Sequence, residues 1–206
     1  MSSATRWSSA LSAPTRNSAE NAMSELILRN RQRSRPLSLP LLRRIARALL
    51  AEFPGLHDHA LGVYLVGAPE MTELNQRYLK HRGSTDVITF DYTSDKPASQ
   101  NRNLKSRKPR PQSSNARPEN AIRGEIVICL DDVLAQARRF HTTWQAEVVR
   151  CLIHGVLHLL RYDDFNPAAR RVMKRHENRM LELLSRRFSF RSLAKPDAHP
   201  RVIRKS

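Results

Sequence analysis

The residues best suited to chemistry in this chain are two histidines and two aspartates within one short stretch. His154 and His158 are four residues apart in an apolar run, and Asp163 and Asp164 follow it. In a helix of about 3.6 residues per turn, side chains four apart lie on nearly the same face, so both imidazoles can reach one ion. Zinc commonly takes histidine nitrogens together with a carboxylate. The spacing therefore predicts a metal site whose third ligand is Asp163 or Asp164.

The histidine pair also has a purely structural interpretation, as two buried imidazoles that are hydrogen-bonded in a helix core. Apolar side chains flank the pair on nearly every side, so we expect this helix to be central to the domain, where polar groups need partners. The adjacent carboxylates favour the metal interpretation. The flanking residues are Leu152, Ile153, Val156, Leu157, Leu159 and Leu160.

Length and charge restrict the class of protein. A chain of 206 residues fits one domain of ordinary size with extensions. Its net charge of +17 and pI of about 11.2 favour a polyanionic partner, such as RNA, DNA or anionic lipid. The alternative is a charge excess that only aids solubility.

The cysteines and the apolar runs exclude two further classes. Cys129 and Cys151 are too few for a disulfide scaffold and form no CxxC pair, so we expect a reducing cytoplasm. No run approaches the roughly 20 apolar residues that span a bilayer, so we expect no integral membrane insertion. Residues 1–22 lack the apolar segment of a secretion signal, and their Ser-rich composition suggests disorder or an organelle transit peptide.

Apolar periodicity places strands and helices in alternation along the chain. This alternation predicts an α/β fold, in which a small mixed sheet of about four strands packs with about five helices. We expect strands at 26–28, 61–67, 86–90 and 124–130. We expect three helices to begin at Pro40, at Pro69 and at Asp131 or Asp132. The histidine helix would follow a capping box of Thr142 and Gln145, and the last helix would begin at Asn166 with Pro167. The last helix carries apolar Val172, Met173, Met180, Leu181 and Leu184.

We expect one hydrolase domain over residues 23–190, between a disordered extension (1–22) and a basic tail (191–206). Within the domain, residues 93–123 read as a basic insertion loop. This segment contains eight Lys or Arg and only two acidic residues, Asp95 and Glu119, so its net charge is eight minus two, or +6. The loop either grips phosphates nonspecifically or is a solvated linker, and the sequence does not decide between these.

A bound divalent ion would make hydrolysis the first reaction class to consider. In the HExxH peptidase pattern a glutamate after the first histidine is the general base, but Gly155 stands at that position. Gly155 instead leaves space beside the metal or lets another element pack closely. This suits a substrate that brings its own chemistry, and RNA does so through its 2′-hydroxyl.

The stretch His154-Gly-Val-Leu-His158-Leu-Leu-Arg-Tyr162-Asp163-Asp164 resembles the signature HGxLHLxGYD of the YbeY proteins, which are bacterial endoribonucleases and ribosomal-RNA maturation factors. Further segments match that family in order, and the resemblance covers about residues 25 to 187. These segments are the LN pair at 74–75, the PTDVLSF-like run at 84–90, the GDI-like run at 124–128, and Met173 with Glu177.

The resemblance implies a single α/β domain that holds one zinc ion and cleaves single-stranded RNA. By position, the metal ligands would be His154, His158 and Asp164, where most relatives have a third histidine. His154 and His158 would be catalytic through the ion. The implied setting is the cytoplasm, with a role at the 3′ end of the small-subunit (16S) ribosomal RNA and in ribosome quality control. The implied partners are ribosomal RNA and the small ribosomal subunit.

The chain departs from the family pattern at two positions. Leu79 stands where the family often has an arginine for a substrate phosphate, and Arg82 is the nearest substitute, so we predict a catalytic phosphate contact for Arg82. Arg161 replaces the glycine that precedes the Tyr-Asp pair in the family. The family's glycine permits a positive φ at this position, and a strained ordinary turn is the alternative. The Arg161 guanidinium would face either substrate or Asp163. Asp163 itself is expected to stabilise the turn or to orient a ligand.

Three functions remain open at this point. The first is a zinc-dependent endoribonuclease that matures ribosomal RNA. The second is a metal-stabilised ribosome-assembly or RNA-binding factor with little cleavage activity, which Leu79 supports. The third is a zinc peptidase, against which Gly155 counts. For two other polar residues of the matched segments we expect structural roles. Asp86 would shape a turn, and Glu177 would form a salt bridge.

Overall fold

The computed structural model describes residues 24–56, 58–93 and 121–195. The expected N-terminal extension, residues 94–120 of the basic loop and the end of the basic tail lie outside these residues. Among the described residues, no helix is both long and apolar enough to cross a membrane.

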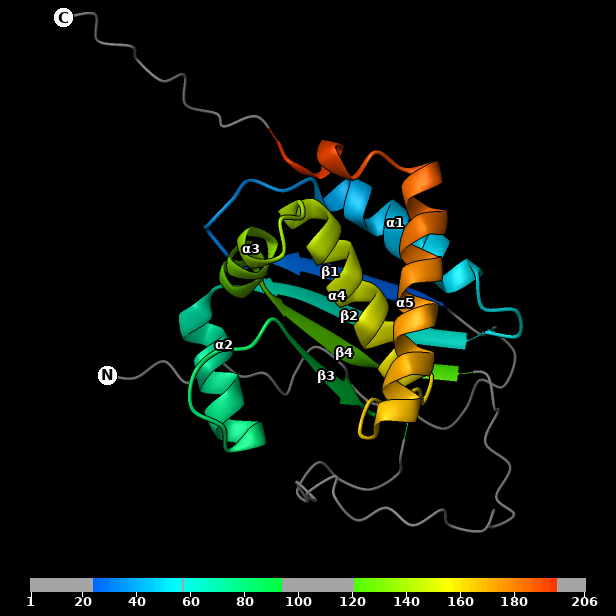
Figure 1. Ribbon diagram of the computed structural model, residues 1–206, viewed down its shortest axis with the longest axis horizontal. Helices are drawn as coiled ribbons and strands as arrows, with labels where there is room; N and C mark the ends of the chain where they lie inside the picture. The colour runs from blue at the N-terminus through cyan, green and yellow to red at the C-terminus, as the bar shows by residue number, and fades with distance from the viewer. Residues whose placement is uncertain (1–23, 57, 94–120, 196–206) are drawn as a thin grey trace, which may run out of the picture.

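The described chain forms the small mixed sheet that the alternation predicts. Its strands are β1 (Glu25–Asn30), β2 (Asp58–Val66), β3 (Val87–Asp91) and β4 (Ala121–Cys129), in the order β1-β2-β4-β3. Strands β1, β2 and β4 run parallel, while β3 pairs antiparallel with β4. The antiparallel edge strand β3 follows α2 along the chain, and it lies beside the C-terminal half of α4 in Figure 1.

The described residues form five α-helices, as we expected, and α5 packs on α1 and α4 (Figure 1). A π-helical turn (Asn75–Leu79) continues α2, and a 3₁₀ turn (Phe190–Leu193) follows α5. The helices are α1 (Leu39–Ala51), α2 (Ala68–Leu74), α3 (Leu130–Arg139), α4 (Trp144–Leu159) and α5 (Pro167–Arg187).

Alternating residues of the strands build two apolar cores, one on each face of the sheet. The larger core contains Leu61, Val63 and Leu65 of β2, and it is covered by α1, α4 and α5. The smaller core contains Tyr64 and Val66 of the same strand, packed against α2. The histidine helix α4 lies on the larger core, so the sheet supports the candidate site from behind.

A glycine lets α4 lie unusually close to the sheet. A Cβ atom added at Gly155 would be only 2.8 Å from three side-chain atoms of Ile126 in β4. Of the two explanations that the sequence left open for Gly155, close packing is therefore the one that the structure supports. A glutamate at this position, as in the HExxH peptidases, would collide with Ile126.

Helix starts differ in detail from the sequence-based expectations. The N-cap of α4 is Thr143, whose hydroxyl accepts a hydrogen bond from the Ala146 amide. The expected capping box of Thr142 and Gln145 is not formed, and the Thr142 hydroxyl donates to the Glu147 carboxylate. The N-cap of α3 is Cys129, and both Asp131 and Asp132 lie in its first turn. Thr142 and Thr143 offer equivalent caps in sequence, and only the chain's path out of the previous element chooses between them. For α3 the helix begins before either expected cap.

Segment boundaries differ as well. Residues 121–123, expected in the basic loop, pair with β2 as the start of β4. Leu193, expected in the basic tail, is completely buried, and Leu37 bridges to Ala194. Val172, one of the apolar residues of α5, is 37% exposed, whereas Glu177 of the same helix is buried. The start of α5 is confirmed, because the Asn166 side chain accepts from the Ala169 amide and Pro167 follows it.

Candidate metal centre

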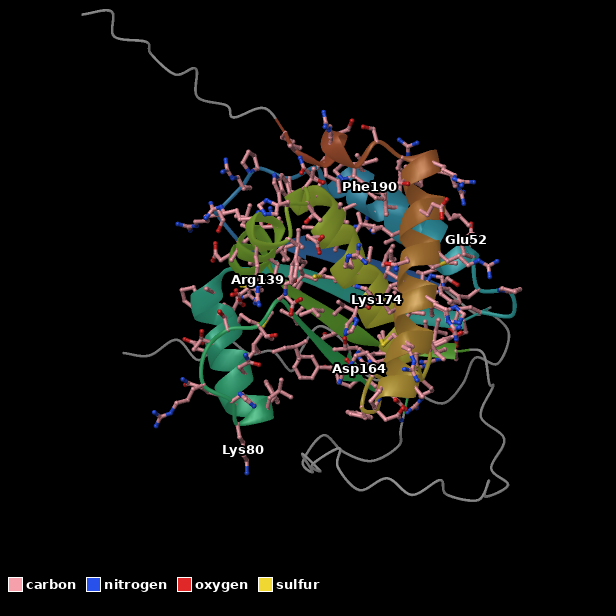
Figure 2. All side chains as sticks on the ribbon, viewed as in Figure 1. Glu52, Lys80, Arg139, Asp164, Lys174 and Phe190 are labelled. Atoms are coloured by element: carbon pink, nitrogen blue, oxygen red, sulfur yellow. The ribbon has the colours of Figure 1, made fainter. Side chains whose placement is uncertain are left out.

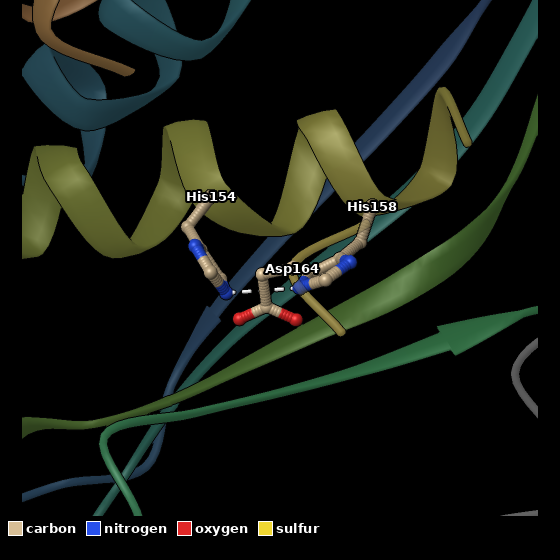
Figure 3. Close-up of side chains that lie close together, drawn as sticks. All are labelled: His154, His158 and Asp164. Carbon is tan, nitrogen blue, oxygen red and sulfur yellow. Dashed lines mark hydrogen bonds between the residues drawn. The ribbon is translucent and has the colours of Figure 1, made fainter. Parts of the chain in front are cut away.

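Three side chains converge at the C-terminal end of α4, as Figure 3 shows. His154 and His158 project from consecutive turns of the helix, and Asp164 returns toward them from the loop that follows. One ligand atom from each lies within 4.8 Å of the others. The two histidine Nε2 atoms are 2.9 Å apart. The structure thus brings together the two histidines with Asp164, while Asp163 turns elsewhere.

Each imidazole is fixed through its other ring nitrogen. His154 Nδ1 lies 2.6 Å from a carboxylate oxygen of Glu177 on α5, and His158 Nδ1 lies 3.1 Å from the carbonyl oxygen of Tyr162. Metal-binding histidines typically donate this second N–H to a carboxylate or a backbone carbonyl, which fixes both the tautomer and the ring orientation. Both rings therefore present Nε2 toward Asp164.

The donor set fits a cation between the rings. An ionised carboxylate and a carbonyl oxygen only accept hydrogen bonds, so each Nδ1 carries a proton and each neutral ring directs an Nε2 lone pair at the other. Two lone pairs at 2.9 Å repel unless a proton or a metal ion lies between them. The nearby Asp164 carboxylate adds negative charge to the same space. Two nitrogens with one carboxylate oxygen are a donor set that suits a divalent transition-metal ion.

The turn after α4 brings Asp164 to the histidines. The Tyr162 amide donates to the Leu157 carbonyl and the Arg161 amide to the His158 carbonyl, both at 3.0 Å. These two bonds define a Schellman motif, which requires a left-handed residue after the helix. Arg161 has that conformation, with φ 72°, so of the two alternatives for this position the structure has the positive φ. The same turn aims the Tyr162 carbonyl at His158.

The Arg161 side chain faces neither the cavity nor Asp163. Its guanidinium lies 3.0 Å from the carboxylate of Asp91 and donates to the Thr93 hydroxyl at 2.8 Å. These contacts tie the turn to the end of β3. Asp163 accepts from the Phe165 amide, so of its two expected roles the turn role is the one that the structure supports.

A cavity of about 850 Å³ opens beside His154 and Asp164. Residues 85–87 and Gln136 of α3 line one side of it, and α4, Asp164 and α5 line the rest. Its cationic side chains are Arg150, Arg170, Arg171 and Lys174. The Asp86 carboxylate accepts from the Gln136 amide at 2.7 Å and from its own neighbour, the Val87 amide, at 3.1 Å. Asp86 therefore joins the start of β3 to α3, in keeping with the structural role that we expected.

Arg82 is not among the residues that line this cavity. It is exposed on the bend that follows the π-helical turn. Figure 2 shows Lys80, two residues before it, pointing away from the sheet, while Asp164 lies beside the start of α5. The structure thus brings the three predicted ligands together but leaves Arg82 outside the cavity beside them.

The charges of the site are shaped by burial and by pairing. Burial, together with the neighbouring His154, lowers the pKa of His158, so this ring is neutral at neutral pH and free to bind a cation. Burial alone would raise the pKa of Glu177, but its hydrogen bond with His154 and the nearby Lys174 ammonium bring that pKa below its ordinary value. Glu177 is consequently an anion that stabilises a proton on His154 Nδ1.

Sequence reasoning assigned Glu177 a salt bridge and missed its contact with His154. The signal was present, because a charged residue stands on the apolar stripe of α5, between buried Met173 and Met180. A carboxylate in such a position needs a partner within the core. Arg150 was also missed; it lies within 3.8 Å of Glu177 and within 3.5 Å of Glu147.

Comparisons with known proteins identify the family and agree with the fold. The family model described as Endoribonuclease YbeY matches residues 28–185, well over half of the chain. Endoribonuclease YbeY of Parabacteroides distasonis is 36% identical over 115 residues, which cover 56% of this chain and 64% of that protein. Endoribonuclease YbeY of Chlorobium luteolum is 33% identical over 144 residues, which cover 69% of this chain and 88% of that protein.

The fold has a solved counterpart. The solution structure of a Thermotoga maritima protein matches with a TM-score of 0.52 and 22% identity, over 86% of this chain and all of that one. At that identity the likeness concerns the fold alone. The family match concerns the sequence itself, and its range of residues 28–185 includes the histidine helix and the segments before it. This chain belongs to the YbeY family.

Proposed function

We propose that this protein is a zinc-dependent endoribonuclease that cleaves single-stranded RNA. The observation that supports this most directly is the convergence of His154, His158 and Asp164 within 4.8 Å, beside a cavity with four cationic side chains. The named relatives are endoribonucleases, and the net charge of +17 suits a polyanionic substrate.

Zinc is the proposed ion because two imidazoles and one carboxylate leave a fourth position open, as in catalytic zinc sites. When bound there, it would polarise a phosphoryl oxygen and acidify a coordinated water. Asp164 carries negative charge where an imidazole would be neutral, so this site holds the ion more strongly by charge and leaves it less electrophilic.

The chain's own residues would hold the ligands and the substrate. Glu177 and the Tyr162 carbonyl keep both imidazoles turned toward Asp164. The Arg170 guanidinium donates to the Asp164 backbone carbonyl at 3.2 Å, which steadies the ligand loop and keeps a cation beside it. Cations placed around a phosphate favour the transition state of its cleavage, because negative charge accumulates on its oxygens.

We further propose that the substrate is ribosomal RNA, at the 3′ end of the small-subunit RNA, and that the small ribosomal subunit presents it in the cytoplasm. A role in ribosome quality control follows from the same activity. Arg82 stays our prediction for a phosphate contact outside the cavity, and the cleavage rate of Arg82→Gln measures that contribution.

The test is metal analysis paired with cleavage of a labelled ribosomal RNA 3′-end precursor. Wild-type protein should contain about one zinc and cleave the precursor, whereas His158→Ala and Asp164→Ala should lose both metal and cleavage. His141→Ala, an exposed histidine outside the cavity, is the control and should match wild type. Cleavage that persists undiminished in His158→Ala would refute the assigned site.

A second candidate is a ribosome-assembly factor in which the ion only stabilises the fold. The observation that favours it is Leu79, 44% exposed where the family often has an arginine. In that case His158→Ala would lower thermal stability and ribosome association, and neither variant nor wild type would cleave the precursor. A peptidase is disfavoured because Gly155 packs against Ile126, where a glutamate base would be needed.

A further inference from the structure

The outer surface of α5 carries cations that join two cavities. Arg171 and Lys174 line the cavity beside the metal ligands, and they also line a second depression of about 450 Å³. The second depression is completed by other α5 residues, including Arg175 and Asn178. Because the two hollows share two residues, they form one continuous surface that leads from Asp164 along the helix. Figure 2 labels Asp164 and Lys174 on this side of the molecule.

The part of this surface that α5 contributes is almost entirely positive, whereas Asp86 and Glu147 line the opposite side of the first cavity. Residues 167–178 contain Arg170, Arg171, Lys174 and Arg175 but only one acidic residue, Glu177. Glu177 is 5% exposed and bonds to His154. Its carboxylate therefore belongs to the ligand site and does little to neutralise the outside of the helix.

Two of these arginines have no anionic partner within the described part of the chain. Arg150 contacts Glu147 and Glu177, and Lys174 contacts Glu177. No such contact, and no hydrogen bond of the side chain, exists for Arg171 or Arg175 among the described residues. An exposed guanidinium without a carboxylate keeps all its donors available for an external anion, and phosphate matches its geometry well.

The cations form a row because of helical periodicity. Residues 171, 174, 175 and 178 are spaced three and four apart, so they share one face, and neighbours are roughly 5–6 Å apart at Cβ. Met173, Glu177 and Met180 occupy the buried face instead. A row of cations on a rigid helix can contact successive phosphates of one strand.

We propose that Arg171, Lys174 and Arg175 bind consecutive backbone phosphates of single-stranded RNA, so that the strand runs from the metal site along α5. This inference rests on the proposed function. A positive groove that follows the backbone is the usual basis of single-strand binding. These contacts would add to the phosphate contact that we predict for Arg82, and they come from the helix that also fixes His154.

The test is the salt dependence of RNA binding by the full chain. We would measure the affinity for a short fluorescein-labelled single-stranded RNA by anisotropy, with a chelator present so that no cleavage occurs. The variant is Arg171→Gln/Arg175→Gln. The matched control is Arg33→Gln/Arg47→Gln, which removes the same charge from two exposed arginines that line neither cavity.

Each phosphate contact to a single strand contributes about 0.7 to the slope of log K against log salt. Loss of two contacts should reduce the slope by about 1.4 in the α5 variant and leave it unchanged in the control. With zinc present, the α5 variant should show a raised KM. Equal slopes in both variants would overturn the proposal. Absence of cleavage by wild type would instead refute the proposed nuclease while leaving the binding comparison decisive for this surface.

Discussion

Glu177 Oε1 lies 2.6 Å from His154 Nδ1, and this contact joins α5 to the candidate metal site on α4. Through this contact α5 orients the ring of His154. The two helices also pack through Met173 and Met180 of α5, one turn on either side of Glu177. The geometry of the ligand thus depends on how the helices pack as well as on the histidine spacing.

Replacing Glu177 by glutamine should weaken metal binding without unfolding the protein. Glutamine keeps the size of the side chain but loses the charge that stabilises a proton on His154 Nδ1. Loss of such an orienting partner typically lowers metal affinity about 10- to 100-fold. Chelator competition with zinc measures the change. Glu182→Gln, an exposed residue of the same helix, is the control and should bind zinc like wild type.

The metal-free protein should lose stability as the pH falls through 6.5. Burial lowers the folded-state pKa of His158 below 6.5, so the unfolded chain takes up a proton first and unfolding is favoured below that pH. The lowered pKa of Glu177 adds a second loss below about 4.5, its unfolded value. Urea unfolding of chelated protein at several pH values measures both.

The variant His158→Gln tests whether His158 causes the loss of stability near pH 6.5. His158→Gln should flatten the dependence of the free energy of unfolding near pH 6. It should not abolish it, because burial also lowers the pKa of His59. An unchanged slope in His158→Gln would mean that His158 titrates alike in the folded and unfolded states.

Adding one methyl group at Gly155 should destabilise the fold. The new Cβ would lie 2.8 Å from three atoms of Ile126, and overpacking of this kind typically costs about 1–3 kcal/mol. Urea unfolding measures the loss. In the double variant Gly155→Ala/Ile126→Ala the two changes should cost less than their sum, because the smaller side chain at 126 removes the clash. Additive costs would show that α4 shifts instead.

At Arg161, glycine should be more stable than alanine by about 1 kcal/mol. Both variants lose the ion pair with Asp91 and the bond to Thr93, but only alanine keeps the penalty of a left-handed backbone at φ 72°. Thermal unfolding of the two variants compares them directly. Asp91→Asn measures the ion pair separately, and for a partly exposed pair we expect at most about 1 kcal/mol.

Neither cysteine should react with a thiol reagent in the folded protein. Both are buried without a disulfide, and burial raises the pKa of Cys129 to about 12 and that of Cys151 well above its ordinary value. Because the thiolate is the reactive form, labelling at pH 8 should be slow in buffer and complete in urea. Rapid labelling of one thiol in buffer would reveal local opening around α4 or β4.

Much of the fold follows from local patterns in the sequence. Strand and helix order and the cap at Asn166 were predicted, since each depends on a few adjacent residues. Choices between equivalent neighbours were not. The α4 cap fell on Thr143 and not on Thr142, because the path of the chain from α3 decides which hydroxyl meets the first free amides.

By itself the sequence determined which residues can hold an ion, because two histidines one helical turn apart and a nearby carboxylate are a matter of spacing alone. Tertiary structure decided what surrounds them. In the folded protein Glu177 of α5 contacts His154, and Asp164, not Asp163, lies beside the histidines. Cationic side chains of α4 and α5 line the cavity, and Arg82 lies outside it. Contacts between elements far apart in the chain depend on how helices pack on a sheet, and no local spacing encodes that packing.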